Sequence, residues 1–356
     1  MNSWTKIPLD VKLAMIILLG IFILSILAPL LAYEVRQDSN AIIVPLIPYG
    51  PNTIDVKNQN YVGPFEYQLV YSGYFRHWLG TDKLGRDIAA QLIHGTQTSM
   101  IIGFLSVLLA LIPGVLIGLI AGFKGDKGFM FHWVTAILTF IFSCTFLFYL
   151  LYLPVDVWVH LVLIIAYSSA MYFIIGQLNT YLLNRSYVGF HFPFDSILMR
   201  MVELRKSLPA MFILLGLLTF FSHSGIISLT FTIALLSWTE FARFTRGEVI
   251  NIKKESYIIS AKTLGFSDIR IMMRHIFPNI IPTIAVVTCF AFSGAILLES
   301  SLSFLGIGVP IESVSLGMIL AGGRDLQAWW MVVFPGIMIF IIIFCLNHIA
   351  SYLQES

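Results

Sequence analysis

Long apolar runs separated by short polar segments dominate the pattern along this chain. Eight runs approach or exceed the ~20 residues with which an α-helix crosses a bilayer. They lie at about 12–33, 98–122, 130–152, 157–182, 207–222, 225–244, 280–298 and 331–353. The first follows Lys6 and Lys12, as a secretory signal would, but it is longer than the roughly 7–15 apolar residues of a signal core. We therefore predict an all-α polytopic membrane protein whose first helix is uncleaved.

Composition agrees with this pattern. At 58% hydrophobic and 11% charged residues, the chain has too few polar residues to cover a soluble domain. The cysteines show no CxxC pair and the histidines no HxH or HxxxH spacing, so we expect neither a metal nor another cofactor. The basic residues are not interleaved with aromatic residues, and we expect no nucleic-acid partner.

Charge predicts the orientation. With the N-terminus inside, cytoplasmic segments hold fifteen of the 21 Lys and Arg residues and external segments hold six. Such an excess is typical of cytoplasmic loops. We predict cytoplasmic N- and C-termini, an external loop at 34–97 and a cytoplasmic loop at 250–279. The external loop holds four prolines, which interrupt helices. It is either an ordered surface for a partner protein or a solvated loop without specific contacts.

The cytoplasmic loop has the pattern of two short helices. Gly265 is suited to end the first, because glycine readily adopts the left-handed conformation after a helix. Ser267 is suited to cap the second, with Asp268 in its first turn. Pro278 is expected to stop that helix. Apolar residues at helical spacing are Tyr257, Ile258, Ala261 and Leu264 in the first helix, and Ile269, Met272, Met273 and Ile276 in the second.

Two further patterns lie within the apolar runs. Small residues recur at every fourth position of the second run, at Ser106, Ala110, Gly114, Gly118 and Gly122. Such a face allows close helix packing in lipid, either against a partner subunit or along a pathway through the membrane, or within this subunit.

Two acidic residues lie near the ends of apolar runs. Glu240 is spaced to pair with Arg243 on one helix. Glu299 precedes a serine- and glycine-rich stretch that we expect to be broken or re-entrant, with either a gating or a structural role.

Several motifs resemble those of a known family. In register over roughly 260 residues, they are similar to the C-type permease subunits of the ABC importers for dipeptides, oligopeptides and nickel. The cytoplasmic segment resembles the coupling ("EAA") loop of these permeases, with Ile259 in place of the family's glutamate. The motifs are His77–Asp82, Leu84–Asp87, Trp238–Arg243, Ser260–Gly265, Arg274–Asn279, Gly294–Glu299, Leu302–Gly306 and Phe334–Gly336.

The resemblance implies an ABC importer permease fold with six spans, to which this chain adds two. Gly122–Asp126 and its expected continuation at Phe194–Arg200 are separated by about 65 residues that hold two extra apolar runs. We therefore expect segment 1–33 with the first helix, loop 34–97, and a permease domain 98–353 with a helical hairpin inserted at about 128–190.

The same resemblance implies the function. The chain would be one permease subunit of an ATP-driven importer of peptides or similar solutes in the plasma membrane. Its partners would be a second (B-type) permease, two ATPase subunits, an external solute-binding protein and membrane lipid. The residues implied to couple to the ATPase are Glu255, Ser260, Ala261, Gly265, His275, Ile276 and Pro278.

Two other functions remain as alternatives. A secondary transporter or channel usually shows internal repeats or intramembrane charges. An intramembrane enzyme needs paired catalytic groups or metal ligands at membrane depth. The chain has no GxxxxGK[ST] phosphate loop, so we do not expect it to hydrolyse ATP by that route. The energy source would be another polypeptide or an ion gradient.

Overall fold

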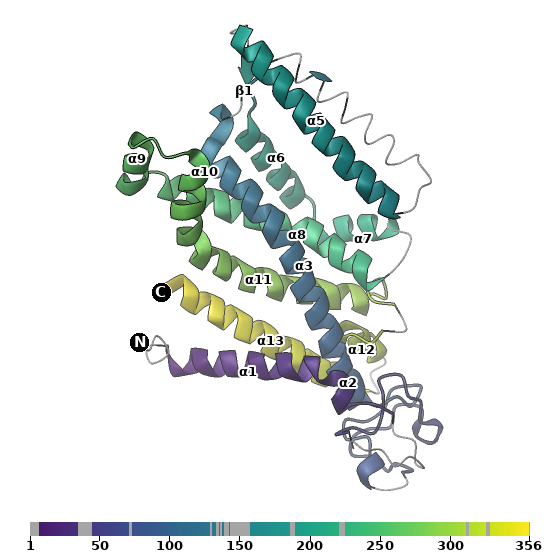
Figure 1. Ribbon diagram of the computed structural model, residues 1–356. Coiled ribbons are helices and arrows are strands. Elements are labelled where there is room, and N and C mark those ends of the chain that lie inside the picture. The colour runs from purple at the N-terminus through teal and green to yellow at the C-terminus, as the bar shows by residue number, and fades with distance from the viewer. Residues whose placement is uncertain are drawn as a thin grey trace. The chain divides into compact units, whose positions relative to one another are not determined.

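Helices make up most of the described chain (Figure 1). The computed structural model describes residues 7–34, 45–70, 73–128, 130–132, 135, 137–138, 142, 157–185, 189–220, 225–310, 313–324 and 328–355. The helices are α1 (Leu9–Ile26), α2 (Ala28–Leu31), α3 (Ile88–Lys124), α5 (Val157–Arg185), α6 (Phe194–Ser207), α7 (Ala210–Phe220), α8 (Ile226–Ile252), α9 (Ser256–Thr263), α10 (Asp268–Ile271), α11 (Phe277–Phe304), α12 (Leu316–Gly322) and α13 (Trp330–Glu355). Single 3-10 turns lie at Val56–Asn58, Gly73–Phe75 and Gly125–Lys127.

The chain divides into two units, Met1–Leu119 with Val202–Ser356, and Ile120–Met201. In the first unit α13 packs along α1, α11 and α12, and α11 also packs against α8. Buried side chains of α3, α7, α8 and α11 form its largest core. Because lipid tails are as apolar as these side chains, close packing rather than burial from water holds such helices together. The members of this core include Ile102, Leu214, Leu229, Ile233, Phe241 and Leu302.

The second unit contains α5 and a two-stranded antiparallel ladder. Strands β1 (Met130–His132) and β2 (Gly189–His191) pair with Phe131 opposite Phe190. The ladder corrects the sequence prediction of a helix from residue 130, because aromatic residues favour an extended strand when a partner is available. The rest of the run 130–152 lies almost entirely outside the described residues. The inserted hairpin therefore stays a prediction.

Four helices within the described residues are long and apolar enough to cross a membrane. They are Leu9–Ile26, Ile88–Lys127, Asp268–Phe304 and Trp330–Glu355, and each coincides with one of the eight predicted spans. Helices α5, α7 and α8 lie on three further predicted spans. The polytopic all-α fold is confirmed, whereas the number of eight spans stays a prediction.

Different segments of the first unit lie at the two ends of its long helices. Figure 1 shows both chain termini and α9 at one end of the long helices, and the segment 45–87 at the other. His348 at the end of α13 and Asp10 at the start of α1 are joined by a 2.9 Å contact between Nε2 and Oδ2. The termini and the 250–279 loop therefore lie on one side of the helices, as predicted.

Candidate functional site

The loop between α8 and α11 has the helix–glycine–helix form that the sequence predicts. Gly265 has a φ of +80°. Its N–H donates to the carbonyl of Lys262, and the N–H of Phe266 donates to the carbonyl of Ala261. These two bonds form a Schellman motif, which satisfies carbonyl groups that the end of a helix would leave unpaired.

The second half of the loop corrects two predictions. Pro278 does not stop the helix. Instead α10 continues through a π-helical turn, η5 (Met272–Ile276), into α11, with Pro278 in the first turn of α11. The π-helical turn, in which the Phe277 N–H donates to the carbonyl of Met272, interrupts the α-helical hydrogen bonds just before Pro278, so the proline is accommodated without ending the helix. Ser267 occupies the N-cap position as predicted, but its side chain makes no capping hydrogen bond.

The predicted coupling residues divide into two groups by exposure. Glu255, Ser260, Gly265 and Pro278 are exposed, whereas Ala261 is 6% exposed and Ile276 is fully buried. His275 is half-buried and stacks on Phe266, with the ring centroids 6.5 Å apart. The buried pair therefore packs under the loop and fixes its shape, and the exposed group lies on its surface.

The small residues of α3 pack within this subunit, against α8. A β-carbon added to Gly114 would lie 2.6 Å from the carbonyl oxygen of Trp238. At Gly118 it would lie 2.5 Å from the carbonyl oxygen of Ala242. The hydroxyl of Ser106 donates to the carbonyl of Thr230 at 3.1 Å. Residue numbers rise in both helices from the Ser106–Thr230 contact to the Gly118–Ala242 contact. Helices α3 and α8 therefore run parallel.

Ala110 and Gly122, the other members of this small-residue face, are also buried in α3. Gly122 belongs to the second unit, so the contact with α8 is described for Ser106, Gly114 and Gly118.

Glu240 pairs with Arg243 as predicted, with 3.1 Å between Oε2 and Nη2. Its other oxygen, Oε1, lies 3.1 Å from Nη1 of Arg205 and 3.5 Å from Nζ of Lys206. The sequence reasoning missed these two partners, because α6 is distant in sequence and only the fold brings its end to α8. Three cations thus surround one carboxylate.

Glu299 is fully buried at the centre of a group of hydroxyls. Ser99 of α3 donates to its Oε2 at 2.6 Å, and Ser303 donates to Oε1 at 2.8 Å. Ser300 donates to Oε2 at 3.3 Å. The N–H of Leu316, at the start of α12, points to the Ser99 hydroxyl at 3.4 Å. The carboxylate therefore joins α3 and α11, and Ser99 extends this link to α12.

The stretch after Glu299 breaks only in its second half. Helix α11 continues to Phe304, and the turn comes at Gly306, which has a φ of +80°. The helix tolerates its serines because their hydroxyls have partners within it, such as the Ser301 hydroxyl on the carbonyl of Leu297 at 2.7 Å.

Replacing Glu299 with leucine is expected to destabilise the assembled protein by roughly 2–3 kcal/mol, because three buried hydroxyls lose their acceptor. Glu299→Gln keeps the shape and one acceptor oxygen, and should lose much less. Thermal unfolding of the purified transporter compares the two variants. A leucine variant that is as stable as the parent but fails in transport would contradict the structural role and favour a gate.

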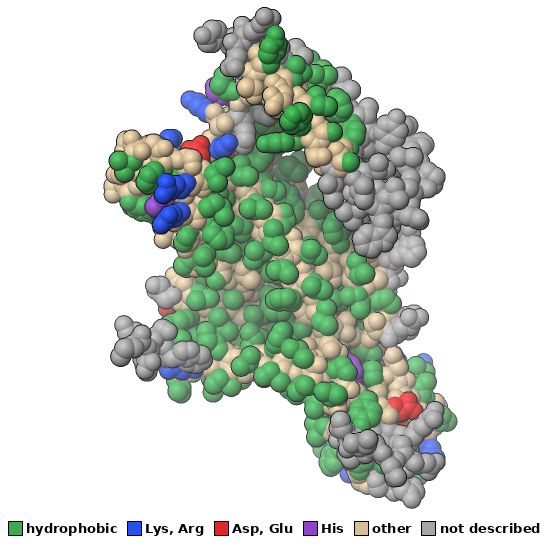
Figure 2. Space-filling model, in the orientation of Figure 1, with side chains coloured by type: hydrophobic (Ala, Val, Ile, Leu, Met, Phe, Trp, Pro, Cys, Tyr) green, Lys and Arg blue, Asp and Glu red, His purple; other side chains and the backbone are tan. Residues whose placement is uncertain are grey.

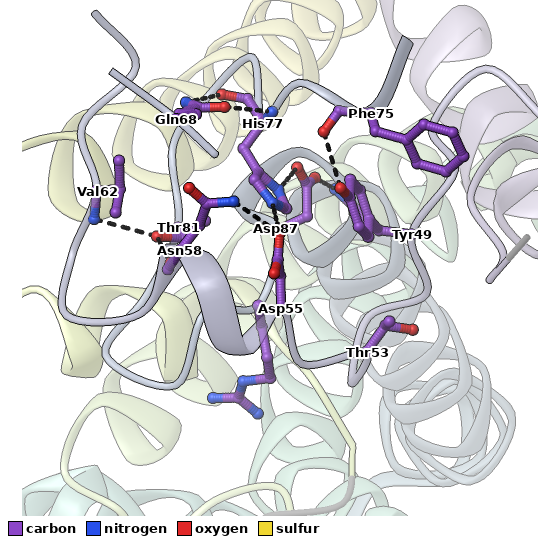
Figure 3. A network of polar contacts seen from close by, with 12 residues as sticks. Tyr49, Thr53, Asp55, Asn58, Val62, Gln68, Phe75, His77, Thr81 and Asp87 are labelled. Atoms are coloured by element: carbon purple, nitrogen blue, oxygen red, sulfur yellow. Dashed lines mark hydrogen bonds and ion pairs between the residues drawn. The ribbon is translucent and has the colours of Figure 1, made fainter. Parts of the chain in front are cut away.

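The segment 45–87 is ordered by a second polar network (Figure 3). His77 is fully buried, with Nδ1 2.8 Å from Oδ2 of Asp87 and Nε2 3.3 Å from Oδ2 of Asp55. The ring of Tyr49 stacks on His77 with 4.3 Å between centroids, and its hydroxyl donates to the carbonyl of Phe75 at 2.8 Å. Only an ordered loop maintains such contacts, which agrees with the prediction from its prolines.

The charges within this network favour a protonated imidazole. Burial lowers the pKa of His77, but hydrogen bonds and charge from Asp87 and Asp55 outweigh it, so that the pKa is raised above its ordinary value. Burial raises the pKa of Asp55, yet hydrogen bonds from Asn58, Lys57 and His77 bring it below its ordinary value. The sequence motifs contain His77 and Asp87, but nothing in their spacing indicates Asp55 or Tyr49 as partners.

Comparisons with known proteins found relatives among transport permeases. Residues 181–356 match the family described as "Binding-protein-dependent transport system inner membrane component". The di/tripeptide transport system permease protein DppC of Pseudomonas aeruginosa is 26% identical over 286 residues, 80% of this chain and 72% of that protein. The oligopeptide transport system permease protein OppC of Salmonella typhimurium is 34% identical over 164 residues, 46% of this chain and 54% of that protein.

A solved structure of the MetNI methionine ABC transporter in an inward-facing conformation is also similar. It has 12% identity and a TM-score of 0.44, and the match covers 74% of this chain and 96% of that one.

The fold and the family match define a multi-pass inner-membrane permease. The C-terminal half of the chain matches the permease component of binding-protein-dependent importers, and most of its length is similar to C-type permeases such as DppC. Such a permease works with a further permease and with ATPase subunits. The match therefore supports the importer interpretation rather than a secondary transporter or channel.

Proposed function

We propose that this chain forms half of the pore of an ATP-driven importer of peptides or similar small solutes. The names of the relatives support a peptide substrate. The observation that carries the coupling role is an apolar surface on α9 and α10, beyond the long helices. There Leu264 is 74% exposed and Ile269 is 70% exposed. Exposed apolar side chains on a polar segment are typical of a protein-docking surface.

This surface, which we call the docking surface, includes Ile259, Leu264, Ile269 and Met273, all exposed. Ile259 replaces the family's glutamate, so we expect an apolar contact with the ATPase at that point. Lys262, Arg270 and Arg274 lie in the same loop as the docking surface and are also exposed. Figure 2 shows Lys and Arg side chains gathered at this end of the molecule.

The docking surface is connected rigidly to the membrane helices. Ile258, Ile271 and Ile276 are buried beneath it, and the Asn279 side chain donates to the Tyr257 hydroxyl at 2.8 Å. Because the helix is continuous from Asp268 to Phe304, a displacement of the loop moves α11 as one body. Helix α11 contacts α8, α12 and α13. Closure of the ATPases would thus reorient these helices and open the pathway alternately to each side.

The orientation follows from charge. We place the docking surface and both termini in the cytoplasm, since most basic residues then lie inside. The segment 45–87 faces outward, where Phe65 and Tyr67 are both strongly exposed, and we assign it to contact with the solute-binding protein or the second permease. The remaining partners are a B-type permease and two ATPases. The ATPases supply the ATP hydrolysis, since this chain has no phosphate loop with which to perform it.

Cysteine cross-linking tests the docking surface. In a chain whose Cys144, Cys289 and Cys345 are alanine, Leu264→Cys should cross-link to a cysteine in the ATPase cleft, in good yield. Ala261→Cys, one turn away but buried, is the matched control and should cross-link far less. The yields are read from gels of the assembled transporter. Equal yields, or none from Leu264→Cys in a transport-competent complex, would overturn the proposal.

A further inference from the structure

A cationic cluster lies beside a large apolar cavity in the first unit. The cluster consists of Arg205, Lys206 and Arg243 around the single carboxylate of Glu240. Three positive charges against one negative charge leave a formal excess of two. The carboxylate of Glu240 therefore does not neutralise the cluster, and the remaining positive charge can attract a further anion.

Two donors of the cluster are also unused. The Nε atoms of Arg205 and Arg243 are buried and have no hydrogen-bond partner among the described residues. A buried N–H without a partner is costly, and more so on a charged group. Arg243 lies over the ring of Phe244, with its guanidinium carbon 4.4 Å from the ring centroid. The Nε of each guanidinium group therefore lacks an acceptor, although the terminal nitrogens bind Glu240.

The cavity next to them has a volume of about 730 Å³. Pockets for drug-sized ligands span roughly 300–1,000 Å³. Arg205, Ser237, Glu240, Thr283 and Gln354 are its polar lining residues, and apolar side chains of α8, α11 and α13 line the remainder. The apolar part includes Phe244, Val286, Val287, Phe290, Ala291 and Leu298. The site thus has a cationic group at one side and an apolar wall along the other.

We propose that this cavity binds an anionic phospholipid, with the phosphate at Arg205, Lys206 and Arg243 and an acyl chain along α11. Charge complementarity and the two unused donors call for an anion, and the apolar wall calls for a hydrocarbon chain. A peptide would match the cations with its carboxylate but would leave its backbone groups unpaired against that wall. The predicted span 225–244 ends at the cluster, which places it at the cytoplasmic headgroup level of the proposed orientation, where anionic lipids gather.

Removing the excess charge tests the headgroup. Lys206→Gln with Arg243→Gln leaves the Arg205–Glu240 pair intact, so the carboxylate keeps a partner. The probe is the assembled transporter reconstituted in phosphatidylcholine vesicles with phosphatidylglycerol, then extracted for native mass spectrometry. Retained phosphatidylglycerol should fall about tenfold or more, because each basic side chain near an anionic lipid contributes roughly fivefold. Lys12→Gln with Lys127→Gln removes two charges from other segments that the sequence predicts to be cytoplasmic, and should change retention little.

Filling the cavity tests the acyl chain. Nothing lies within 4 Å of a β-carbon added to Gly294, so Gly294→Leu projects into open space without a clash. It should displace the phosphatidylglycerol, whereas Gly294→Ala should retain it. Both variants keep every charge of the cluster, and the size of the added side chain is their sole difference.

Three outcomes would overturn the proposal. Retention that does not depend on the cluster or on the side chain at position 294 would show that the lipid binds elsewhere. A parent complex that retains no phosphatidylglycerol would show that the second permease fills the cavity. Charge variants that weaken peptide uptake but retain the lipid would assign the cations to the transported solute.

Discussion

Replacing Gly265 with valine should abolish solute uptake while ATP hydrolysis by the assembled transporter continues. Gly265 has a φ of +80°, and a non-glycine residue in this region costs about 1–2 kcal/mol, more when it is β-branched. An added β-carbon would meet nothing within 4 Å, so the substitution acts through the backbone alone. The Schellman motif would open and α9 would lose its fixed angle to α10. Uptake and hydrolysis, measured on the same vesicles, should separate by more than about tenfold.

Two matched variants isolate the backbone effect of Gly265→Val. Asparagine tolerates the left-handed conformation, so Gly265→Asn should retain most of the uptake. Gly247, in the regular helix α8, also has nothing within 4 Å of an added β-carbon, and Gly247→Val should preserve coupling. If Gly265→Val transports as well as Gly265→Asn, the fixed angle of this loop plays no part in coupling.

The loop shows which local features a single sequence predicts. Gly265 was expected in the left-handed conformation because it follows an apolar helical pattern and few other residues adopt that backbone freely. Pro278 was wrongly expected to end a helix, because a proline is restrictive only where its N–H would be needed. The π-helical turn at Met272–Ile276 shifts the hydrogen-bond pattern just before Pro278, so that the helix continues without that N–H. Periodicity does not reveal such a change of helical pitch.

The contacts of Glu299 show why long-range partners are harder to predict. The sequence marks Glu299 as unusual, since a carboxylate in an apolar run needs partners. Ser99, its shortest contact, is 200 residues away in the chain, and nothing in either segment indicates the other. Glu240 is a second example. Its pairing with Arg243 could be predicted from helical spacing, whereas its pairing with Arg205 could not.

The small-residue face of α3 could be predicted to pack closely, but not against which helix. The sequence left a partner subunit, the pathway and the subunit's own interior as alternatives. The structure shows that Gly114 and Gly118 pack within the subunit, since their backbones approach those of Trp238 and Ala242 in α8. Because α8 leads directly into the docking surface, this contact connects the α3 helix to the segment that we propose the ATPase moves.

Replacing Gly118 with leucine should prevent α3 and α8 from packing and remove most of the assembled transporter. The first added atom would lie 2.5 Å from the backbone oxygen of Ala242 and 3.0 Å from its Cα, and a backbone has no rotamer with which to yield. Overpacking against side chains costs about 1–3 kcal/mol, so we expect at least the upper end of that range here. Assembly is measured as the fraction of the complex that elutes as a single species after extraction. Gly247→Leu, in α8 with open space around it, is the control and should assemble normally. Normal assembly and uptake by Gly118→Leu would show that α3 and α8 tolerate a wider spacing, and that the close contact between them is not required to pass motion from the loop to the membrane.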